Sequence, residues 1–220
     1  MAVQNHWCTG TLISKKHVLT AAHCLCKDIK NYEVIIGSVY LGKGKKYNII
    51  LWMSYEQWAS SKNIPLQIPV NDISVILLEN AINDPHIISA TFSNKTDQEL
   101  YGSTVLVAGW SILNNIEASY YMKMALLKIL IKNDCEEIMN RHKGMRIIIF
   151  DTMFCTIAYP SILLSYGDSG GPLLDTNNNL IGVNKGTCPK NEKSITTNVV
   201  NIHTSMHYYK NFINEILNTF

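Results

Sequence analysis

Hydrophobic and polar residues alternate along this chain in short runs, which are separated by residues typical of turns. Alternation over a few residues predicts β-strands, and the longer helical period is rare here. Many short strands with few helices favour an antiparallel sandwich or barrel over an α/β sheet. The predicted strands cover Cys8–Ile13, His17–Thr20, Glu33–Ile36, Tyr47–Met53, Ile73–Leu78, Thr104–Ala108, Lys123–Leu130, Thr152–Cys155, Pro172–Leu174, Leu180–Asn184 and Asn198–His203.

The clearest helical period lies at the end of the chain. There, apolar side chains recur three or four positions apart, at Tyr208, Phe212, Ile213, Ile216 and Leu217. The sequence shows no internal repeat and no low-complexity linker. We expect residues 111–121 to join two β-rich halves.

Composition narrows the class of protein. The 220 residues are 47% hydrophobic, which is enough for one packed unit or for two half-domains that share a cleft. The net charge is only +2 and no long run of one sign occurs, so neither nucleic acid nor a membrane surface is an expected partner. Apolar stretches such as Met124–Ile131 are interrupted by lysine, so we expect no membrane span.

Six cysteines lie at positions 8, 24, 26, 135, 155 and 188, and their spacing fits no zinc site. A disulfide framework is the better interpretation, and it indicates an oxidising compartment. The sequon Asn94-Lys95-Thr96 agrees with secretion, because such sites carry glycans in secreted proteins.

The segment GDSGG, residues 167–171, surrounds one hydroxyl group, that of Ser169. A serine becomes a nucleophile when a base removes its proton, and the attacked carbonyl then needs backbone N–H donors. Flanking glycines let such donors approach, so we expect the N–H groups of Gly167 and Ser169 to form an oxyanion hole. The alternative is a polar turn between strands, which is the commoner meaning of an isolated motif of this kind.

A base and an orienting acid are available elsewhere in the chain. LTAAHC places His23 after a β-type run and two small alanines, and NDISVILL places Asp72 at the head of an apolar strand. Taken singly, the histidine would more often be structural and the aspartate a turn residue. Together they give the order His, Asp, Ser of the serine-protease template, which differs from the order in α/β-hydrolases.

With these motifs in order, the chain resembles the chymotrypsin/trypsin family of serine endopeptidases nearly from end to end. The matching segments are CTGTLISKKHVLTAAHC, NDISVILL, VAGWS at 107–111, GDSGGPLL and YYKNFINEIL. The resemblance implies an all-β fold of two six-stranded antiparallel barrels packed around a cleft, with a short C-terminal helix. It places the first barrel in residues 1–110, the second in 122–206 and the helix in 207–220.

The resemblance also implies two disulfides, Cys8–Cys24 and Cys135–Cys155. Cys188 matches a family cysteine whose partner position holds Ser165 here, and Cys26 has no obvious counterpart. A Cys26–Cys188 bond is possible by number, but the resemblance implies that the two lie on different walls of the cleft, so we expect both to remain as thiols.

Three positions are implied to line the specificity pocket. Leu163 would form its floor and offers no counter-charge to a basic side chain, so trypsin-like cleavage is disfavoured. Gly186 and Asn201 would form its walls, and the asparagine would narrow the pocket. Small or medium apolar side chains are the expected guests, and a largely blocked pocket is the alternative.

Two departures from the family bear on activity. Family members are activated when a new amino terminus pairs with the aspartate before the nucleophile, here Asp168, and this chain starts at Met1 without such a terminus or a signal peptide. Either the sequence is a fragment that lacks its first strands, or this form is not catalytically competent. In addition, Lys185 stands where the family has tryptophan.

Two functions therefore compete. The first is a secreted, monomeric serine endopeptidase that acts on proteins or peptides, with protease inhibitors as further partners. The second is a catalytically inactive homologue that acts as a secreted binding or regulatory protein. A β-rich domain with coincidental motifs is disfavoured by the number of ordered matches. No cofactor is implied, and no metal is expected because residues 50–71 contain only Glu56 as an acid.

Overall fold

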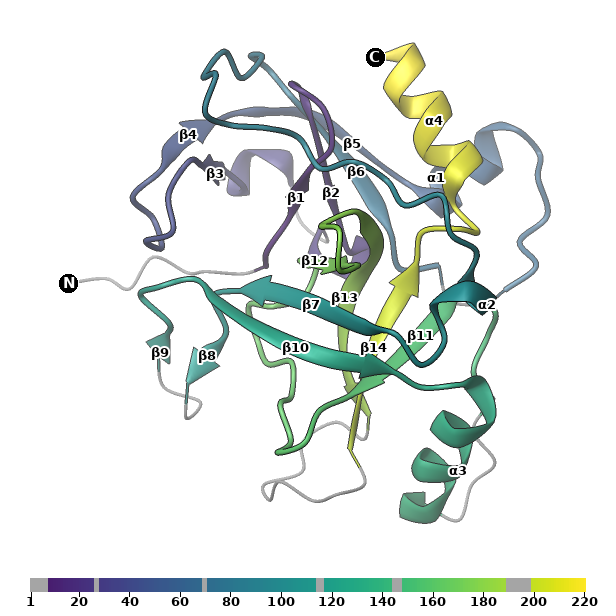
Figure 1. Ribbon diagram of the computed structural model, residues 1–220. Helices are drawn as coiled ribbons and strands as arrows, with labels where there is room; N and C mark the ends of the chain where they lie inside the picture. The colour runs from purple at the N-terminus through teal and green to yellow at the C-terminus, as the bar shows by residue number, and fades with distance from the viewer. Residues whose placement is uncertain (1–7, 26–27, 69–70, 114–116, 144–147, 189–198) are drawn as a thin grey trace.

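The computed structural model describes residues 8–25, 28–68, 71–113, 117–143, 148–188 and 199–220 (Figure 1). Its α-helices are α1 (Tyr55–Ser61), α2 (Asp97–Leu100), α3 (Lys132–Lys143) and α4 (Lys210–Thr219). Its β-strands are β1 (Thr11–Leu12), β2 (His17–Thr20), β3 (Val34–Ile36), β4 (Lys45–Tyr47), β5 (Ile49–Ser54), β6 (Ser74–Leu78), β7 (Thr104–Gly109), β8 (Ile112–Leu113), β9 (Glu117–Ala118), β10 (Lys123–Ile129), β11 (Met153–Ile157), β12 (Pro172–Leu174), β13 (Leu180–Cys188) and β14 (Val200–Ser205).

Six strands of the carboxyl-terminal half close into an antiparallel barrel in the order β10-β11-β14-β13-β12-β7 (Figure 1). Along β7, buried and more exposed residues alternate: Val105 and Val107 are buried, whereas Leu106 between them is partly exposed. They pack with Leu127, Phe154 and Leu173 in the centre of the barrel. The predicted all-β fold class is confirmed.

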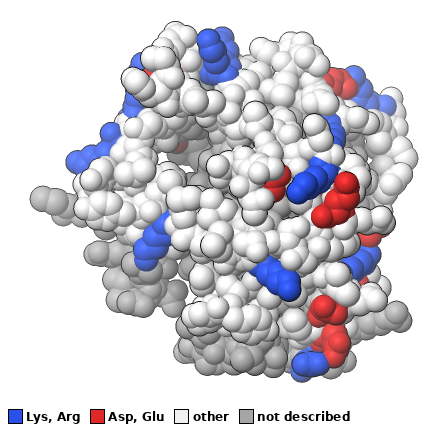
Figure 2. Space-filling view, in the orientation of Figure 1, with Lys and Arg blue, Asp and Glu red and all other residues white. Residues whose placement is uncertain are grey.

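The amino-terminal half contains a four-stranded sheet, β1-β2-β6-β5, and a two-stranded sheet, β3-β4. In the part of the chain that the structure describes, β1 pairs only with β2 and β3 only with β4, so these sheets do not close into a second barrel. A cavity of about 910 Å³ lies between them, and its lining includes Leu12, Val34 and Ile36. Figure 2 shows a hollow in this part of the surface.

The last helix joins the two halves. Phe212, Ile213 and Ile216 of α4 are buried, as the helical period predicted, and they share one core with Tyr55 and Trp58 of α1. Figure 1 shows α4 beside α1, across the molecule from α3. The same core includes side chains of β2 and β13, so one apolar cluster spans both halves.

Two expectations about organisation were wrong. The strand at residues 104–109 belongs to the closed barrel, so the first half does not extend to residue 110. For the same reason residues 111–121 do not join the halves; they include the β8–β9 hairpin between two barrel strands. Alternation predicts that a segment is a strand, but it does not reveal which sheet the strand enters.

Helix α1 was not predicted, although a local signal was present. The Ser54 hydroxyl accepts a hydrogen bond from the N–H of Gln57, and the Gln57 side chain accepts one from the N–H of Ser54. This reciprocal capping box marks a helix start in sequence. No helix in the described ranges is long and apolar enough to cross a membrane.

Candidate active site

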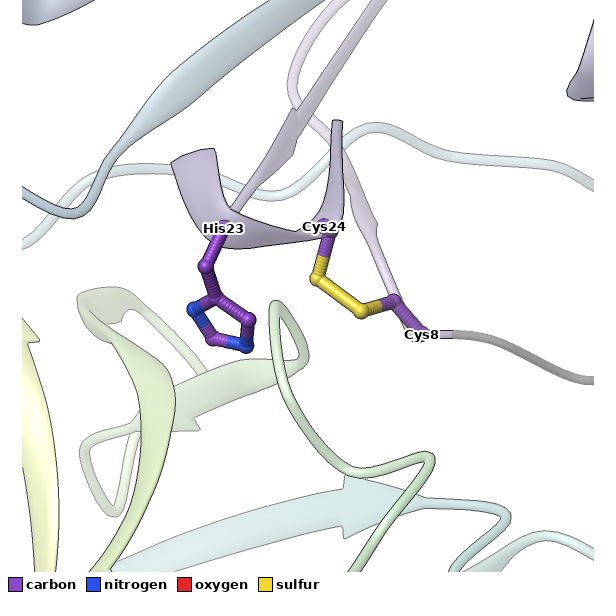
Figure 3. Close-up of side chains that lie close together, drawn as sticks. All are labelled: Cys8, His23 and Cys24. Atoms are coloured by element: carbon purple, nitrogen blue, oxygen red, sulfur yellow. A yellow bond between two sulfur atoms is a disulfide. The ribbon is translucent and has the colours of Figure 1, made fainter. Parts of the chain in front are cut away.

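His23 lies in a short 3-10 turn, Ala22–Cys24, that follows β2. Ala21 is completely buried just before it, so a small side chain is required where the turn meets the core. Cys24 is bonded to Cys8, which anchors the turn to the segment that leads into β1. Figure 3 shows the imidazole beside this disulfide.

Cys8, His23 and Cys24 place potential metal-ligand atoms within 4.8 Å of one another. Zinc binds cysteine as a free thiolate, and both sulfur atoms are consumed by the disulfide. The cluster therefore offers one imidazole and is not a metal centre.

Asp72 holds His23 through both carboxylate oxygens. The backbone N–H of His23 donates to Asp72 Oδ1 at 2.9 Å, and Nδ1 of the His23 ring lies 2.8 Å from Asp72 Oδ2. Because a carboxylate only accepts, Nδ1 carries a proton and Nε2 is left to act as a base. The Asp72 side chain is 7% exposed and that of His23 is 47% exposed, so the ring faces solvent while its anchor is buried.

The chain around Asp72 is fixed by the last strand and the segment before α4. The Thr204 hydroxyl donates to the Asp72 carbonyl at 3.2 Å, and the Tyr209 hydroxyl donates to Asn71 Oδ1 at 3.0 Å. Burial raises the pKa of Asp72. The hydrogen bonds from His23 and the charges of His23 and Lys185 lower it by more, so the pKa lies below its ordinary value. Asp72 is therefore ionised at neutral pH.

The turn that carries Ser169 is fitted closely against the amino-terminal half. The N–H of Thr9 donates to the Ser169 carbonyl at 2.8 Å, and the Thr9 hydroxyl donates to the Gly167 carbonyl at 2.7 Å. Gly170 has a φ of +81°, and a Cβ there would lie 2.1 Å from Thr20 Oγ1. Only glycine permits this approach, which explains one glycine of GDSGG.

The Ser169 turn also lies against the His23 turn, since Cys24 Sγ is 3.8 Å from the Ser169 carbonyl oxygen. The Ser169 hydroxyl, however, makes a long hydrogen bond of 3.4 Å to the Lys185 carbonyl. The structure therefore brings His23 and Asp72 into contact and places Ser169 nearby, with its hydroxyl directed to β13. Among the described residues, the N–H of Ser169 donates to no acceptor, as an oxyanion-hole donor requires.

Asp168 is buried next to the nucleophile. The N–H of Ser165 donates to its Oδ2 at 3.0 Å, and the absence of a Cβ at Gly109 leaves room for Oδ1. Burial raises the pKa of Asp168 to about 6, against the opposing effects of the Ser165 N–H, Lys123 and the Ser111 N–H.

The remaining expected site residues are dispersed around this centre. Leu163 and Gly186 are half-buried, and Asn201 is fully buried in β14. A disulfide joins Cys135 to Cys155, and Asn94 is exposed before α2.

Two cysteines were expected to remain as thiols. Cys26 lies outside the described residues, and Cys188 ends β13. That expectation stays a prediction.

Sequence reasoning missed a buried polar group behind the nucleophile. Thr156, Asn184 and His203 are fully buried, and the His203 ring is hydrogen-bonded to the side chains of the other two. The available signal was the run VVNIHTS, in which polar and apolar residues are mixed. All the residues of β14 within this run are buried.

Comparisons with known proteins show what the chain as a whole resembles. A family model described as Trypsin matches residues 1–213. Chymotrypsin of Phaedon cochleariae is 30% identical over 185 residues, which make up 80% of this chain and 62% of that protein. Chymotrypsin-2 of Vespa crabro is 30% identical over 172 residues, 77% of this chain and 72% of that one. Trypsin epsilon of Drosophila erecta is 28% identical over 183 residues, 81% of this chain and 67% of that one.

The chain thus spans between 62% and 72% of the length of these relatives. Among solved structures, neuropsin, a serine protease of mouse brain, superposes with a TM-score of 0.77 at 22% identity. That match covers 96% of this chain and 88% of neuropsin, and it supports the fold.

Proposed function

Because the chain belongs to the trypsin family, we propose that it is a secreted serine endopeptidase that acts through His23, Asp72 and Ser169. The observation that carries the proposal is the double hydrogen bond from His23 to a buried Asp72. It fixes the tautomer in which Nε2 can accept a proton. Relatives named as chymotrypsins and trypsins support the reaction class.

In the proposed reaction, His23 Nε2 removes the proton of Ser169 as Oγ attacks the peptide carbonyl. The oxyanion is stabilised by the N–H groups of Gly167 and Ser169, and the imidazolium by Asp72. His23 then protonates the leaving amine, and the acyl group stays on Ser169. Water, deprotonated by His23, releases the acid and restores the serine. The first step requires the Ser169 hydroxyl to rotate from the Lys185 carbonyl to His23, a change between staggered rotamers.

Asp168 supports a control step in this proposal. A buried carboxylate that meets no ion-pair partner within 4 Å among the described residues is unfavourable when charged. A cationic amino terminus released by processing would pair with it and order the neighbouring Gly167 and Ser169. Activity would then depend on that processing.

The substrate is a protein or peptide, and Leu163 supports cleavage after residues that are not basic. An apolar floor cannot compensate the desolvated charge of lysine or arginine. Secretion is supported by the two disulfides and by the exposed Asn94 sequon. The proposed unit is a monomer of one peptidase domain.

An inactive binding protein on the same fold is the second candidate. The direction of the Ser169 hydroxyl, towards the Lys185 carbonyl, favours it. So do Lys185 and Ser165, which replace the tryptophan and the cysteine of the family. The intact His23, Asp72 and Ser169 favour the enzyme.

A fluorophosphonate that carries only small alkyl groups distinguishes the two candidates. The probe reacts with a serine that a base activates, so the protein expressed from its complete gene and processed should be labelled. We expect Ser169→Ala to abolish labelling, and Ser161→Ala, at a half-buried serine outside the proposed triad, to leave it unchanged. Processed wild-type protein that resists labelling would favour the binding protein.

A further inference from the structure

The buried side of the nucleophile is filled by polar side chains of β14 and its two neighbours. Asn201 lies between β11 and β13, opposite Thr156 on one side and Thr187 on the other. Its side chain is fully buried. The position implied to form a pocket wall is therefore inside the barrel and is not in contact with solvent.

Both ends of the Asn201 amide are hydrogen-bonded to the segment that precedes the nucleophile. The N–H of Leu164 donates to Asn201 Oδ1 at 2.7 Å, and Asn201 Nδ2 donates to the Ile162 carbonyl at 2.9 Å. These two backbone groups flank Leu163, the implied pocket floor. The amide thus occupies the space beside Leu163 that a substrate side chain would need.

A second layer lies behind the first. His203 is two residues after Asn201 and so projects from the same face of β14. Its Nδ1 is 3.0 Å from Asn184 Oδ1, which can only accept, so Nδ1 carries the proton. Its Nε2 then accepts from the Thr156 hydroxyl at 2.8 Å. Burial lowers the pKa of His203 to about 3, which keeps the ring neutral.

This layer is tied to the nucleophile turn through the backbone of Asn184. The N–H of Gly170 donates to the Asn184 carbonyl at 2.7 Å, and the N–H of Asn184 donates to the Gly171 carbonyl at 2.8 Å. Neither His203 nor Asn184 can move aside for a ligand without loss of buried hydrogen bonds.

The opposite implied wall is open. Gly186 has a φ of +154°, and a Cβ built there would meet no atom within 4 Å. A peptide backbone can approach β13 here. The space beside the nucleophile is therefore accessible to main chain at Gly186 and closed to a long side chain at Asn201.

We propose that Asn201 closes the specificity pocket, so that the site accepts glycine or alanine at the residue whose carbonyl is attacked and excludes large apolar residues. The inference rests on the proposed endopeptidase function and names its substrate class. Displacing Asn201 would leave the buried Leu164 N–H without its partner and would break the part-buried hydrogen bond to the Ile162 carbonyl, which is unfavourable. A leucine or phenylalanine side chain cannot supply either hydrogen bond.

The test uses peptides that differ only at the residue before the cleaved bond: glycine, alanine, valine, leucine or phenylalanine. For the processed wild-type protein we expect kcat/KM to be at least ~100-fold higher for alanine than for leucine or phenylalanine. In Asn201→Gly, kcat/KM for the two large residues should rise at least ~10-fold relative to alanine. Asn178→Gly, at an exposed turn with a φ of 62°, is the matched control and should keep the wild-type preference.

Far-UV circular dichroism shows whether Asn201→Gly folds; if it does not, Asn201→Ser, which keeps one hydrogen-bonding group, takes its place. Wild-type protein that reacts with the fluorophosphonate and cleaves after leucine as readily as after alanine would overturn the inference. If the fluorophosphonate labels nothing, the proposed function fails and the pocket is tested by indole binding in saturation-transfer NMR. Binding to Asn201→Gly alone supports the closed pocket, whereas binding to both proteins or to neither overturns it.

Discussion

At the scale of single residues, Asp168 combines deep burial with a titratable charge. The residue is 8% exposed, and its carboxylate accepts a hydrogen bond from the backbone N–H of Ser165. Hydrogen bonds of this kind compensate only part of the lost hydration, so Asp168 keeps its proton to a higher pH in the folded protein than in the unfolded chain.

We expect the 220-residue chain to lose stability as pH rises from the ordinary pKa of an aspartate to the raised pKa of Asp168. Burial raises its pKa from 3.8 to about 6, so between these values the folded state holds a proton that the unfolded state releases. The free energy of unfolding should therefore fall between pH 4 and 6 by about 2–3 kcal/mol from this residue and stay low above pH 6.

Urea unfolding at several pH values checks this expectation with Asp168→Asn, which should lack that fall and exceed wild type in stability at pH 7. Asp151→Asn, at a side chain that is 90% exposed, is the control and should follow wild type. An Asp168→Asn curve parallel to that of wild type from pH 4 to 7 would contradict the assignment.

At the residue level, the proposed site rests on local sequence signals. His23 and Ser169 each stand in a short motif whose residue types match one chemical task, and the structure places Asp72 in hydrogen-bonding contact with His23. The direction of the Ser169 hydroxyl could not be predicted, because it depends on the Lys185 carbonyl, sixteen residues away in the chain. The His203 cluster depends in the same way on which strands pair.

At the scale of elements, the two disulfides have different structural tasks. Cys8–Cys24 joins the His23 turn to the segment before β1, whereas Cys135–Cys155 joins α3 to β11 on the other side of the barrel. Their cysteines are 16 and 20 residues apart, so the two closed loops are of similar length.

Replacing both cysteines of either pair with alanine should therefore reduce the free energy of unfolding by a similar amount, about 3 kcal/mol. Only the Cys8→Ala/Cys24→Ala variant should also be labelled more slowly by the fluorophosphonate, because loss of this disulfide frees the turn that holds His23. Denaturant titration and labelling rates of both variants provide the measurement. Equal labelling rates would show that the disulfide does not position His23.

Element-level prediction was accurate for strands and poor for helices. Each predicted strand overlaps an observed one; His17–Thr20 and Pro172–Leu174 have the predicted ends, and the ends of the others differ. Strands β8 and β9 were not predicted. Helix α3 was missed because its sequence, KNDCEEIMNRHK, is largely polar and carries only a short apolar stripe. Its position depends on tertiary contacts of Cys135 and Met139 with β11 and β14.

At the scale of the whole molecule, the candidate site depends on contact between the two halves. His23 and Asp72 come from the amino-terminal half and Ser169 from the carboxyl-terminal half. The two halves are joined directly by the hydrogen bond from the Thr9 N–H to the Ser169 carbonyl. The core shared by α1, α4 and β13 holds this arrangement in place. Of the two barrels that the resemblance implies, the described residues show the carboxyl-terminal one as closed, and the strands of the amino-terminal half form two sheets, β1-β2-β6-β5 and β3-β4.

The cavity between β1 and β3 has a practical consequence for anyone who handles this protein. Dyes such as anilinonaphthalene sulfonate fluoresce when they bind to hydrophobic surface, and their emission is commonly taken as a sign of a partly unfolded sample. A hollow of about 910 Å³, lined by aliphatic side chains such as Val34 together with polar ones such as Lys30 and Glu33, is large enough for such a dye in the intact fold. We expect saturable emission from a sample whose near-ultraviolet circular dichroism is native, so thermal-shift assays should instead follow intrinsic tryptophan fluorescence.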